Sequence, residues 1–411
     1  MISLRADWIL PITGPPIRDG FVAVDEDRIV AIDDRPPAGS VHLGRVAVLP
    51  ALVNAHTHLE LSYLHERVPA STSFNDWVVT LMALRRGFPD PAAADILAAA
   101  AQGVAQARAS GTGLIGDISN TLVTVQILRD AGMAAHVFHE LMGFNIADPG
   151  ERVGQARARA QAAGLDERGV RVSLAPHAPY SVSPELFMAI RADVDAHPNT
   201  VSTVHLGESA DEVELLRHGT GVTRAMLEKL GVWTDAWQVP GVSPVEYLAN
   251  LGFLDSRVLV VHGVQCDGGD LGRLRAMGST LVSCPRSNQH VGVGEPPLEA
   301  FYATGVSVAF GTDSLASVAD LNMFAELAEA RRIAPCVPAR QLLQSATLTA
   351  AHALGFERDF GSIEKGKRAA LIAVRVPAGV DDVEEYLVSG VEPGDISWLP
   401  DGSRSQLGVG S

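Results

Sequence analysis

The chain has 411 residues, of which 47% are hydrophobic, and its formal net charge is −16 at pH 7. This length and composition predict a soluble globular protein with a sizeable core, in one large domain or two smaller ones. The negative charge argues against nucleic acid and anionic membranes as partners, because both require a basic surface on the protein.

The cysteines are few and odd in number: Cys266, Cys284 and Cys336. Such a set is typical of a reduced protein rather than of a disulfide framework. Arg5 and Asp7 interrupt the first apolar residues, and no run reaches the roughly 18 apolar residues of a membrane span. We therefore expect a cytoplasmic protein without a signal peptide.

Both ends of the chain contain short strand-like segments. Residues 2–10, 20–24, 28–32 and 45–49 are apolar runs separated by Pro and Gly turns, and a similar pattern leads into the apolar run 371–374. We expect the two ends to pair into one sheet. The prediction is a small β-sandwich of residues 1–49 plus 360–411, flanking a catalytic domain of residues 50–359.

Strand-like and helix-like segments alternate between these ends. The strand candidates are residues 49–55, 113–118, 134–140, 170–176, 201–206, 258–262, 280–284 and 306–311. The helix candidates are residues 90–109, 150–163, 184–196, 221–230, 270–277 and 321–333. This alternation predicts an α/β fold, a (β/α)8 TIM barrel.

Two histidines close the first of these strands. His56 and His58 are two positions apart, and alternate residues of a strand point to the same side, so both imidazoles can reach one metal ion. Taken alone, such a pair is also compatible with a polar strand edge.

Further polar residues end later apolar runs: His205 with Glu208 three positions on, His262, and Asp313. An α/β barrel presents its catalytic groups at the carboxyl ends of its strands. Each residue alone is compatible with a surface pair or with a satisfied buried polar group. Their joint occurrence favours one metal site.

These motifs occur together with several others in a fixed order. The set comprises His56 to His58, residues 176–183, His205 to Glu208, and residues 261–263, 284–288 and 311–314. In this order the chain resembles the amidohydrolase superfamily, and within it the cytosine-deaminase and chlorohydrolase-like aminohydrolase branch. The resemblance covers nearly the whole chain, including the flanking β segments.

The resemblance implies one divalent metal ion, most readily zinc and otherwise iron or manganese, with four ligands: His56, His58, His205 and Asp313. It implies that Asp313 accepts the proton of the attacking water and that Glu208 protonates the ring nitrogen of the substrate. His262 would orient the water or the developing oxygen. His177 would contact the substrate.

The scarcity of lysine bears on the number of metal ions. The three lysines are Lys229, Lys365 and Lys367. Binuclear members of the superfamily commonly bridge two metals with a carboxylated lysine from the fourth strand. The absence of lysine before residue 229 therefore favours a mononuclear deaminase over a dihydropyrimidinase or dihydroorotase.

Three segments, residues 56–60, 286–288 and 312–317, resemble the aminodeoxyfutalosine deaminases. This implies deamination of 6-amino-6-deoxyfutalosine, an adenine nucleoside analogue that bears a benzoate, to futalosine and ammonia in menaquinone biosynthesis. Alternatives are deamination of adenosine, S-adenosylhomocysteine, 5′-methylthioadenosine, guanine or a pterin, and triazine hydrolysis. The non-enzyme alternative is a catalytically silent barrel.

A benzoate substrate implies a cationic contact. Arg286, with Ser287 and Asn288 beside it, follows the seventh strand candidate and is the predicted contact, with a structural salt bridge as the alternative. Competing candidates are Arg67, Arg85 and Arg86.

Two further features stay open. Glu60 extends the alternation beyond His58, either as an exposed loop carboxylate or as an acceptor for a substrate hydroxyl or ring N–H. The aromatic-containing segment 61–89 is compatible with a lid or with a contact in a homodimer.

Overall fold

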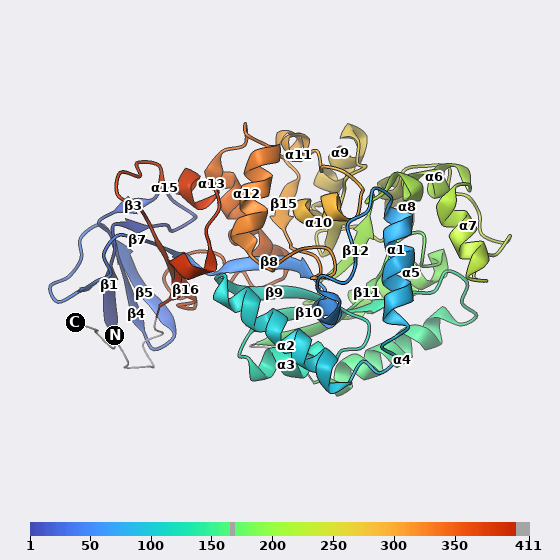
Figure 1. Cartoon of the computed structure of the whole chain (residues 1–411), viewed down its shortest axis with the longest axis horizontal. Helices are drawn as coiled ribbons and strands as arrows, with labels where there is room; N and C mark the ends of the chain where they lie inside the picture. The colour runs from blue at the N-terminus through green and yellow to red at the C-terminus, as the bar shows by residue number, and fades with distance from the viewer. Residues whose placement is uncertain (165–168, 400–411) are drawn as a thin grey trace.

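The computed structural model describes residues 1–164 and 169–399. Figure 1 shows a small β part at one end of the molecule and a larger part in which helices surround parallel strands. The predicted α/β class is confirmed. Within the described ranges, no helix is long and apolar enough to cross a membrane.

Eight parallel strands form the centre of the larger part, in two sheets of order β11-β10-β9-β8 and β12-β13-β14-β15. Their bounds are β8 (Leu52–Thr57), β9 (Thr112–Ser119), β10 (Ala134–Leu141), β11 (Val170–Pro176), β12 (Ser202–Leu206), β13 (Val258–His262), β14 (Thr280–Ser283) and β15 (Ser307–Phe310). Strand β11 contacts β12, and β15 contacts β8. The edge strands of the two sheets therefore lie side by side, and the eight strands follow one another in chain order.

The side chains of these strands separate onto two faces because successive residues of a strand point to opposite sides. Leu114 and Val261 belong to a buried cluster drawn largely from the strands themselves. Their neighbours Ile115 and Val260 belong to the larger cluster that includes the surrounding helices. Both faces are buried, which is why the strands read as continuous apolar runs in the sequence.

The predicted helices are present, with ends shifted by a few residues at most. They are α2 (Ala94–Ala109), α4 (Pro149–Ala162), α5 (Pro184–Ala196), α7 (Val222–Lys229), α9 (Gly268–Met277) and α12 (Met323–Ile333). The start of α5 shows the residues that mark a helix N-terminus in the sequence. Pro184 occupies the first turn, and the Ser183 hydroxyl accepts a hydrogen bond from the Leu186 N–H.

Other helices were not predicted. They are α1 (Phe74–Arg85), α3 (Thr124–Asp130), α6 (Ala210–His218), α8 (Pro244–Asn250), α10 (Pro285–His290), α11 (Leu298–Thr304), α13 (Ala339–Ser345), α14 (Leu348–Ala353) and α15 (Val383–Leu387), with the 3-10 helices η1 (Leu59–Leu64) and η2 (Pro393–Asp395). Most span too few turns for an apolar periodicity to appear in the sequence.

The small β part contains two sheets, of order β5-β4-β1-β6 and β17-β16-β7-β2-β3. Their strands are β1 (Ile2–Arg5), β2 (Trp8–Ile9), β3 (Ile17–Arg18), β4 (Phe21–Asp25), β5 (Arg28–Asp33), β6 (Val41–His42), β7 (Val46–Pro50), β16 (Leu371–Arg375) and β17 (Ile396–Trp398). Strand β16 pairs antiparallel with β7, which confirms that the two chain ends share a sheet. Leu4, Val48 and Leu371 lie in one buried cluster that joins both sheets.

Two strand predictions are wrong in their limits. The predicted strand 2–10 is two strands in different sheets, because the Ala6 N–H bonds to the Gly20 carbonyl and the Asp7 N–H to that of Gly44. The predicted strand 49–55 is also divided: β7 ends at Pro50 and β8 begins at Leu52. In the predicted sandwich of residues 1–49 plus 360–411, residues 400–411 lie outside the described part.

Candidate active site

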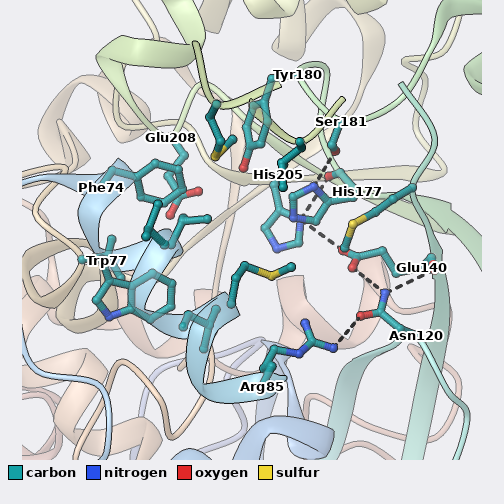
Figure 2. Close-up of a pocket in the computed structure, with 18 of the residues that line it drawn as sticks. Phe74, Trp77, Arg85, Asn120, Glu140, His177, Tyr180, Ser181, His205 and Glu208 are labelled. Carbon is teal, nitrogen blue, oxygen red and sulfur yellow. Dashed lines mark hydrogen bonds and ion pairs between the residues drawn. The ribbon is translucent and has the colours of Figure 1, made fainter. Parts of the chain in front are cut away.

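Polar residues from the carboxyl ends of the parallel strands converge at one cavity, which all of them line except the fully buried His56. They are His56 on β8, Glu140 on β10, His177 after β11, His205 on β12, His262 on β13 and Asp313 after β15. Figure 2 shows Glu140, His177, His205 and Glu208 pointing into the same space. These side chains come together because the carboxyl ends of the parallel strands lie at the same face of the larger part.

Three histidines and one carboxylate lie at ligand spacing. His58 Nε2 lies 3.4 Å from His205 Nε2 and 3.5 Å from Asp313 Oδ1, and His56 Nε2 lies 3.8 Å from that same oxygen. A tetrahedral ion with bonds of about 2.0–2.1 Å separates its donor atoms by roughly 3.3–3.4 Å. The four side chains are therefore spaced as ligands of a single ion.

The environment of His56 fits a metal ligand. Its side chain is fully buried, and within the described chain neither Nδ1 nor Nε2 has a hydrogen-bond partner. Burial lowers the pKa of His56 and of His58 well below the usual range and that of His205 to about 4. Three neutral imidazoles with a carboxylate suit zinc, so the residues fit a divalent ion.

Two residues of the site have a backbone conformation that is uncommon for side-chain-bearing residues. His262 has a φ of 76° and Asp313 a φ of 61°, both in the left-handed region. Such conformations persist only where surrounding contacts hold them, and they concentrate at functional sites. Both residues line the cavity.

Ser287 and Asn288, predicted as substrate contacts, support other site residues. The Ser287 hydroxyl donates to Asp313 Oδ2 at 2.6 Å, and Asn288 Oδ1 lies 3.0 Å from His262 Nδ1. Both side chains are fully buried, and neither lines the cavity. They orient Asp313 and His262 from helix α10.

Glu208 faces His262 across the site, with Oε1 3.5 Å from His262 Nε2. The Glu208 N–H donates to the Glu212 carboxylate at 3.0 Å, which fixes the backbone that carries it. Burial, followed by the nearby Asp313 carboxylate, raises the pKa of Glu208 well above its usual range. A raised pKa favours the protonated form of this carboxyl group, the form that can donate a proton.

Arg286, the predicted cationic contact, is engaged elsewhere. Its Nε donates to Glu326 at 2.6 Å and its Nη1 to Asp320 at 2.8 Å. Glu326 is fully buried, and Arg286 is not among the described residues that line the cavity. The salt-bridge alternative therefore describes Arg286, and the competing Arg85 on α1 lines the cavity instead.

Glu60 is not an exposed loop carboxylate. It is 6% exposed and accepts hydrogen bonds from the side chains of Ser119 and Thr121 and from the N–H groups of Asn120 and Thr121. These hydrogen-bond donors come from the end of β9 and the loop after it. Glu60 is not among the described residues that line the cavity. Glu60 fixes that loop rather than facing a ligand.

Sequence reasoning missed Glu140 and Asn120. Glu140 Oε1 lies 3.5 Å from His205 Nδ1, and Asn120 Nδ2 donates to Glu140 Oε2 at 2.8 Å. The signal for Glu140 was available, because this residue ends the strand candidate 134–140 as His262 ends the candidate 258–262. Asn120 lies on a loop and carries no comparable signal.

The cavity has a volume of about 580 Å³, within the range of small-molecule sites. Helix α1 contributes apolar side chains to its wall, among them Phe74 and Trp77 (Figure 2). Leu81 lines the same wall. Part of the segment 61–89 therefore covers the cavity.

Comparison with known proteins places the chain in a family. The amidohydrolase family matches residues 47–391. The chain is 29% identical to a 5-methylthioadenosine/S-adenosylhomocysteine deaminase of Moorella thermoacetica, over 96% of this chain and 91% of that protein. It is 31% identical to an aminodeoxyfutalosine deaminase of Deinococcus radiodurans, over 76% and 74%.

The fold is also similar to that of a solved deaminase structure. An adenosine deaminase of Xanthomonas campestris with bound zinc superposes with a TM-score of 0.81 at 25% identity, covering 98% of this chain and 92% of that one. The chain belongs to the amidohydrolase family. It is an enzyme of hydrolytic C–N bond cleavage.

We expect His56→Gln to lower the affinity for zinc at least about 100-fold, because loss of even an outer partner of a metal ligand costs about 10–100-fold. The measurement is metal content after dialysis against a competing chelator. His136→Gln is the control, since His136 is equally buried but bonds to Ser173 and to the Leu354 carbonyl. Full retention of zinc by His56→Gln would contradict the ligand assignment.

Proposed function

We propose that this enzyme deaminates an adenine nucleoside hydrolytically, and that its substrate is 6-amino-6-deoxyfutalosine, converted to futalosine and ammonia in menaquinone biosynthesis. The observation that carries the choice of substrate is the charge of the cavity wall. Its carboxylates lie beside the metal-site histidines, whereas its cations come from helices α1 and α7.

His56, His58, His205 and Asp313 would hold one divalent ion, with zinc favoured and iron or manganese compatible. When bound, such an ion makes water a nucleophile near neutral pH. The distances among the four donor groups and the unpartnered His56 ring support this assignment.

The side chains around this position support a proton path. Asp313, held by the Ser287 hydroxyl, would accept a proton from the attacking water. Glu208 would donate its proton to the ring nitrogen next to the reacting carbon and then assist the departure of ammonia. His262, oriented by Asn288, would stabilise the developing oxygen. Water and the amine are consumed, and the oxo ring and ammonia are formed.

The cations of the cavity wall favour an acidic substrate. Arg85 at the end of α1, Arg86 directly after it and Lys229 on α7 line the cavity. Among its described lining residues, the carboxylates are Glu140, Glu208 and Asp313, all beside the histidines. Arg85 Nη2 lies 3.9 Å from the buried Glu60 Oε1, but the described lining residues away from the metal site include no carboxylate, so that wall presents positive charge to the cavity. A benzoate suits that wall better than the zwitterionic amino acid of S-adenosylhomocysteine, whose ammonium would lack an anionic partner.

The apolar wall supports the same choice. Phe74, Trp77, Leu81 and Met82 line the cavity from α1, and Met142 lines it from the segment after β10. Such side chains suit an aromatic ring. The second candidate is deamination of 5′-methylthioadenosine, whose methylthio group this wall also accommodates.

We also propose the architecture that carries the reaction, a closed (β/α)8 barrel over residues 50–359 with a flanking β-sandwich of both chain ends. The His205 N–H bonds to the His177 carbonyl at 2.9 Å and the Asp313 N–H to the His56 carbonyl at 3.0 Å, one at each junction between the two sheets. The three cysteines are free, which supports a reducing, cytoplasmic setting.

The substrate is tested by ammonia release from the zinc-loaded enzyme. We expect 6-amino-6-deoxyfutalosine to exceed adenosine, 5′-methylthioadenosine, S-adenosylhomocysteine and guanine in kcat/KM by at least about tenfold, because only the benzoate-bearing substrate offers the cations of the cavity wall an anionic partner without a neighbouring ammonium. A preference for 5′-methylthioadenosine would keep the reaction and replace the substrate.

Glu208→Gln should retain zinc and lose about 10²–10⁴-fold in kcat, because the amide cannot donate the proton that the ring nitrogen needs. Single-turnover ammonia release with metal analysis measures both properties on one preparation. Turnover within about threefold of the parent enzyme would exclude the proton-donor role.

Arg85→Met should raise KM for 6-amino-6-deoxyfutalosine about 10–150-fold and KM for adenosine much less, because a hydrogen bond to a charged group contributes about 1.5–3 kcal/mol. Arg86→Met is the matched control, since it removes the same charge from the next residue, at the exposed rim. Equal effects of Arg85→Met on both substrates would remove the acid contact from Arg85.

A further inference from the structure

Glu140 is a cavity-lining carboxylate that the proposed reaction does not use. It is 5% exposed, and Asn120 donates to its Oε2 at 2.8 Å. The nearest group to Oε1 is His205 Nδ1 at 3.5 Å, but this nitrogen has its own hydrogen-bond partner in the His177 carbonyl at 3.1 Å. Among the described residues, none donates a hydrogen bond to Oε1.

This free acceptor capacity is large for a buried group. A carboxylate can accept about four hydrogen bonds, and a buried carboxylate without donors is costly. Glu140 lines the cavity, so a ligand bound there can supply the missing donors. An anionic ligand group would be repelled from it, which selects uncharged or cationic donors.

The position of Glu140 indicates which part of a nucleoside would reach it. The reacting ring carbon has to lie near Glu208 and His262, whose Oε1 and Nε2 atoms are 3.5 Å apart. Figure 2 shows Glu208 on one side of His205 and His177, and Glu140 on the other. Glu140 therefore meets the part of the substrate that adjoins the ring without reacting.

A chain of contacts continues from Glu140 away from the metal site. The Asn120 amide donates to Glu140 and, through Oδ1, lies 3.5 Å from Arg85 Nη2 (Figure 2). The contacts thus run from the predicted metal ligand His205 to Glu140, then to Asn120 and finally to Arg85. In a nucleoside with an acidic substituent, the corresponding order is ring, sugar, acid.

We propose that Glu140 is a specificity-determining residue that accepts hydrogen bonds from the vicinal hydroxyls of the nucleoside sugar, held in place for this by Asn120. The inference rests on the proposed function, since it takes the ring to lie at the metal site. It extends that function from the reacting ring to the sugar: the enzyme selects ribonucleosides over deoxynucleosides and free bases.

An alternative role for Glu140 is to bind a second metal ion together with His177 and His205. The metal-ligating atoms of these three side chains lie within 4.8 Å of one another. His177 Nδ1 already lies 2.6 Å from the Ser181 hydroxyl, and His205 Nδ1 is bonded to a carbonyl. The cluster thus has fewer free donor atoms than a second ion needs, and metal counting tests this directly.

The experiment compares adenosine with 2′,3′-dideoxyadenosine in the zinc-loaded parent enzyme and in Glu140→Gln. We expect the parent to prefer adenosine in kcat/KM by about 10–100-fold, and Glu140→Gln to reduce that preference to within about threefold. The loss should appear in KM for adenosine, with dideoxyadenosine turnover and the zinc content nearly unchanged. Arg85→Met is the reciprocal control, because it should alter the preference for an acidic substrate and keep the preference for hydroxyls.

Each other outcome overturns the proposal. A parent enzyme that does not distinguish the two nucleosides excludes sugar recognition without any variant. An equal loss on both nucleosides assigns Glu140 to the support of His205, and two zinc ions in the parent but one in Glu140→Gln make it a metal ligand. Failure of sugar selectivity with intact deamination refutes this inference alone, whereas inactivity of the parent on every adenine nucleoside refutes the proposed function.

Discussion

The junction between the first and last parallel strands is the constraint on which the site depends. The Asp313 N–H bonds to the His56 carbonyl at 3.0 Å, and the Thr57 hydroxyl donates to the Asp313 carbonyl at 2.8 Å. A side chain at Gly311 would place its Cβ 2.7–2.8 Å from His56 atoms, so only glycine permits this approach. Because the two strands meet so closely, His58 and Asp313, which lie far apart in the chain, line one cavity.

The remaining site residues follow the same plan, in which a buried polar group holds each reactive side chain. Ser287 orients Asp313, Asn288 orients His262, and the Glu212 carboxylate fixes the backbone of Glu208. The left-handed conformations of His262 and Asp313 are maintained by this surrounding network rather than by local preference. The supporting residues are therefore as specific to the fold as those that face the cavity.

The sequence predicts much of this arrangement because strand-ending polar residues stand out against apolar runs. His205 and His262 were found in that way, and their positions require no knowledge of distant contacts. The partners of a side chain are not encoded locally. Arg286 follows a strand and was expected at the cavity, yet the carboxylate that holds it, Glu326, lies on α12. Helix α1 was missed because its exposed and cavity-facing residues are both largely apolar, which obscures the helical period.

The pairing of β16 with β7 bears on how the protein is made. Strand β7 acquires this neighbour only after the ribosome has added residue 375, so this edge of the N-terminal sheet is unpaired while all eight parallel strands are made. The eight parallel strands can assemble before that edge is covered. Strand β16 would then pair with β7 and cover the exposed edge of the N-terminal sheet. Until that happens, the open edge of the nascent protein is exposed to aggregation, which dilution or a chaperone would prevent.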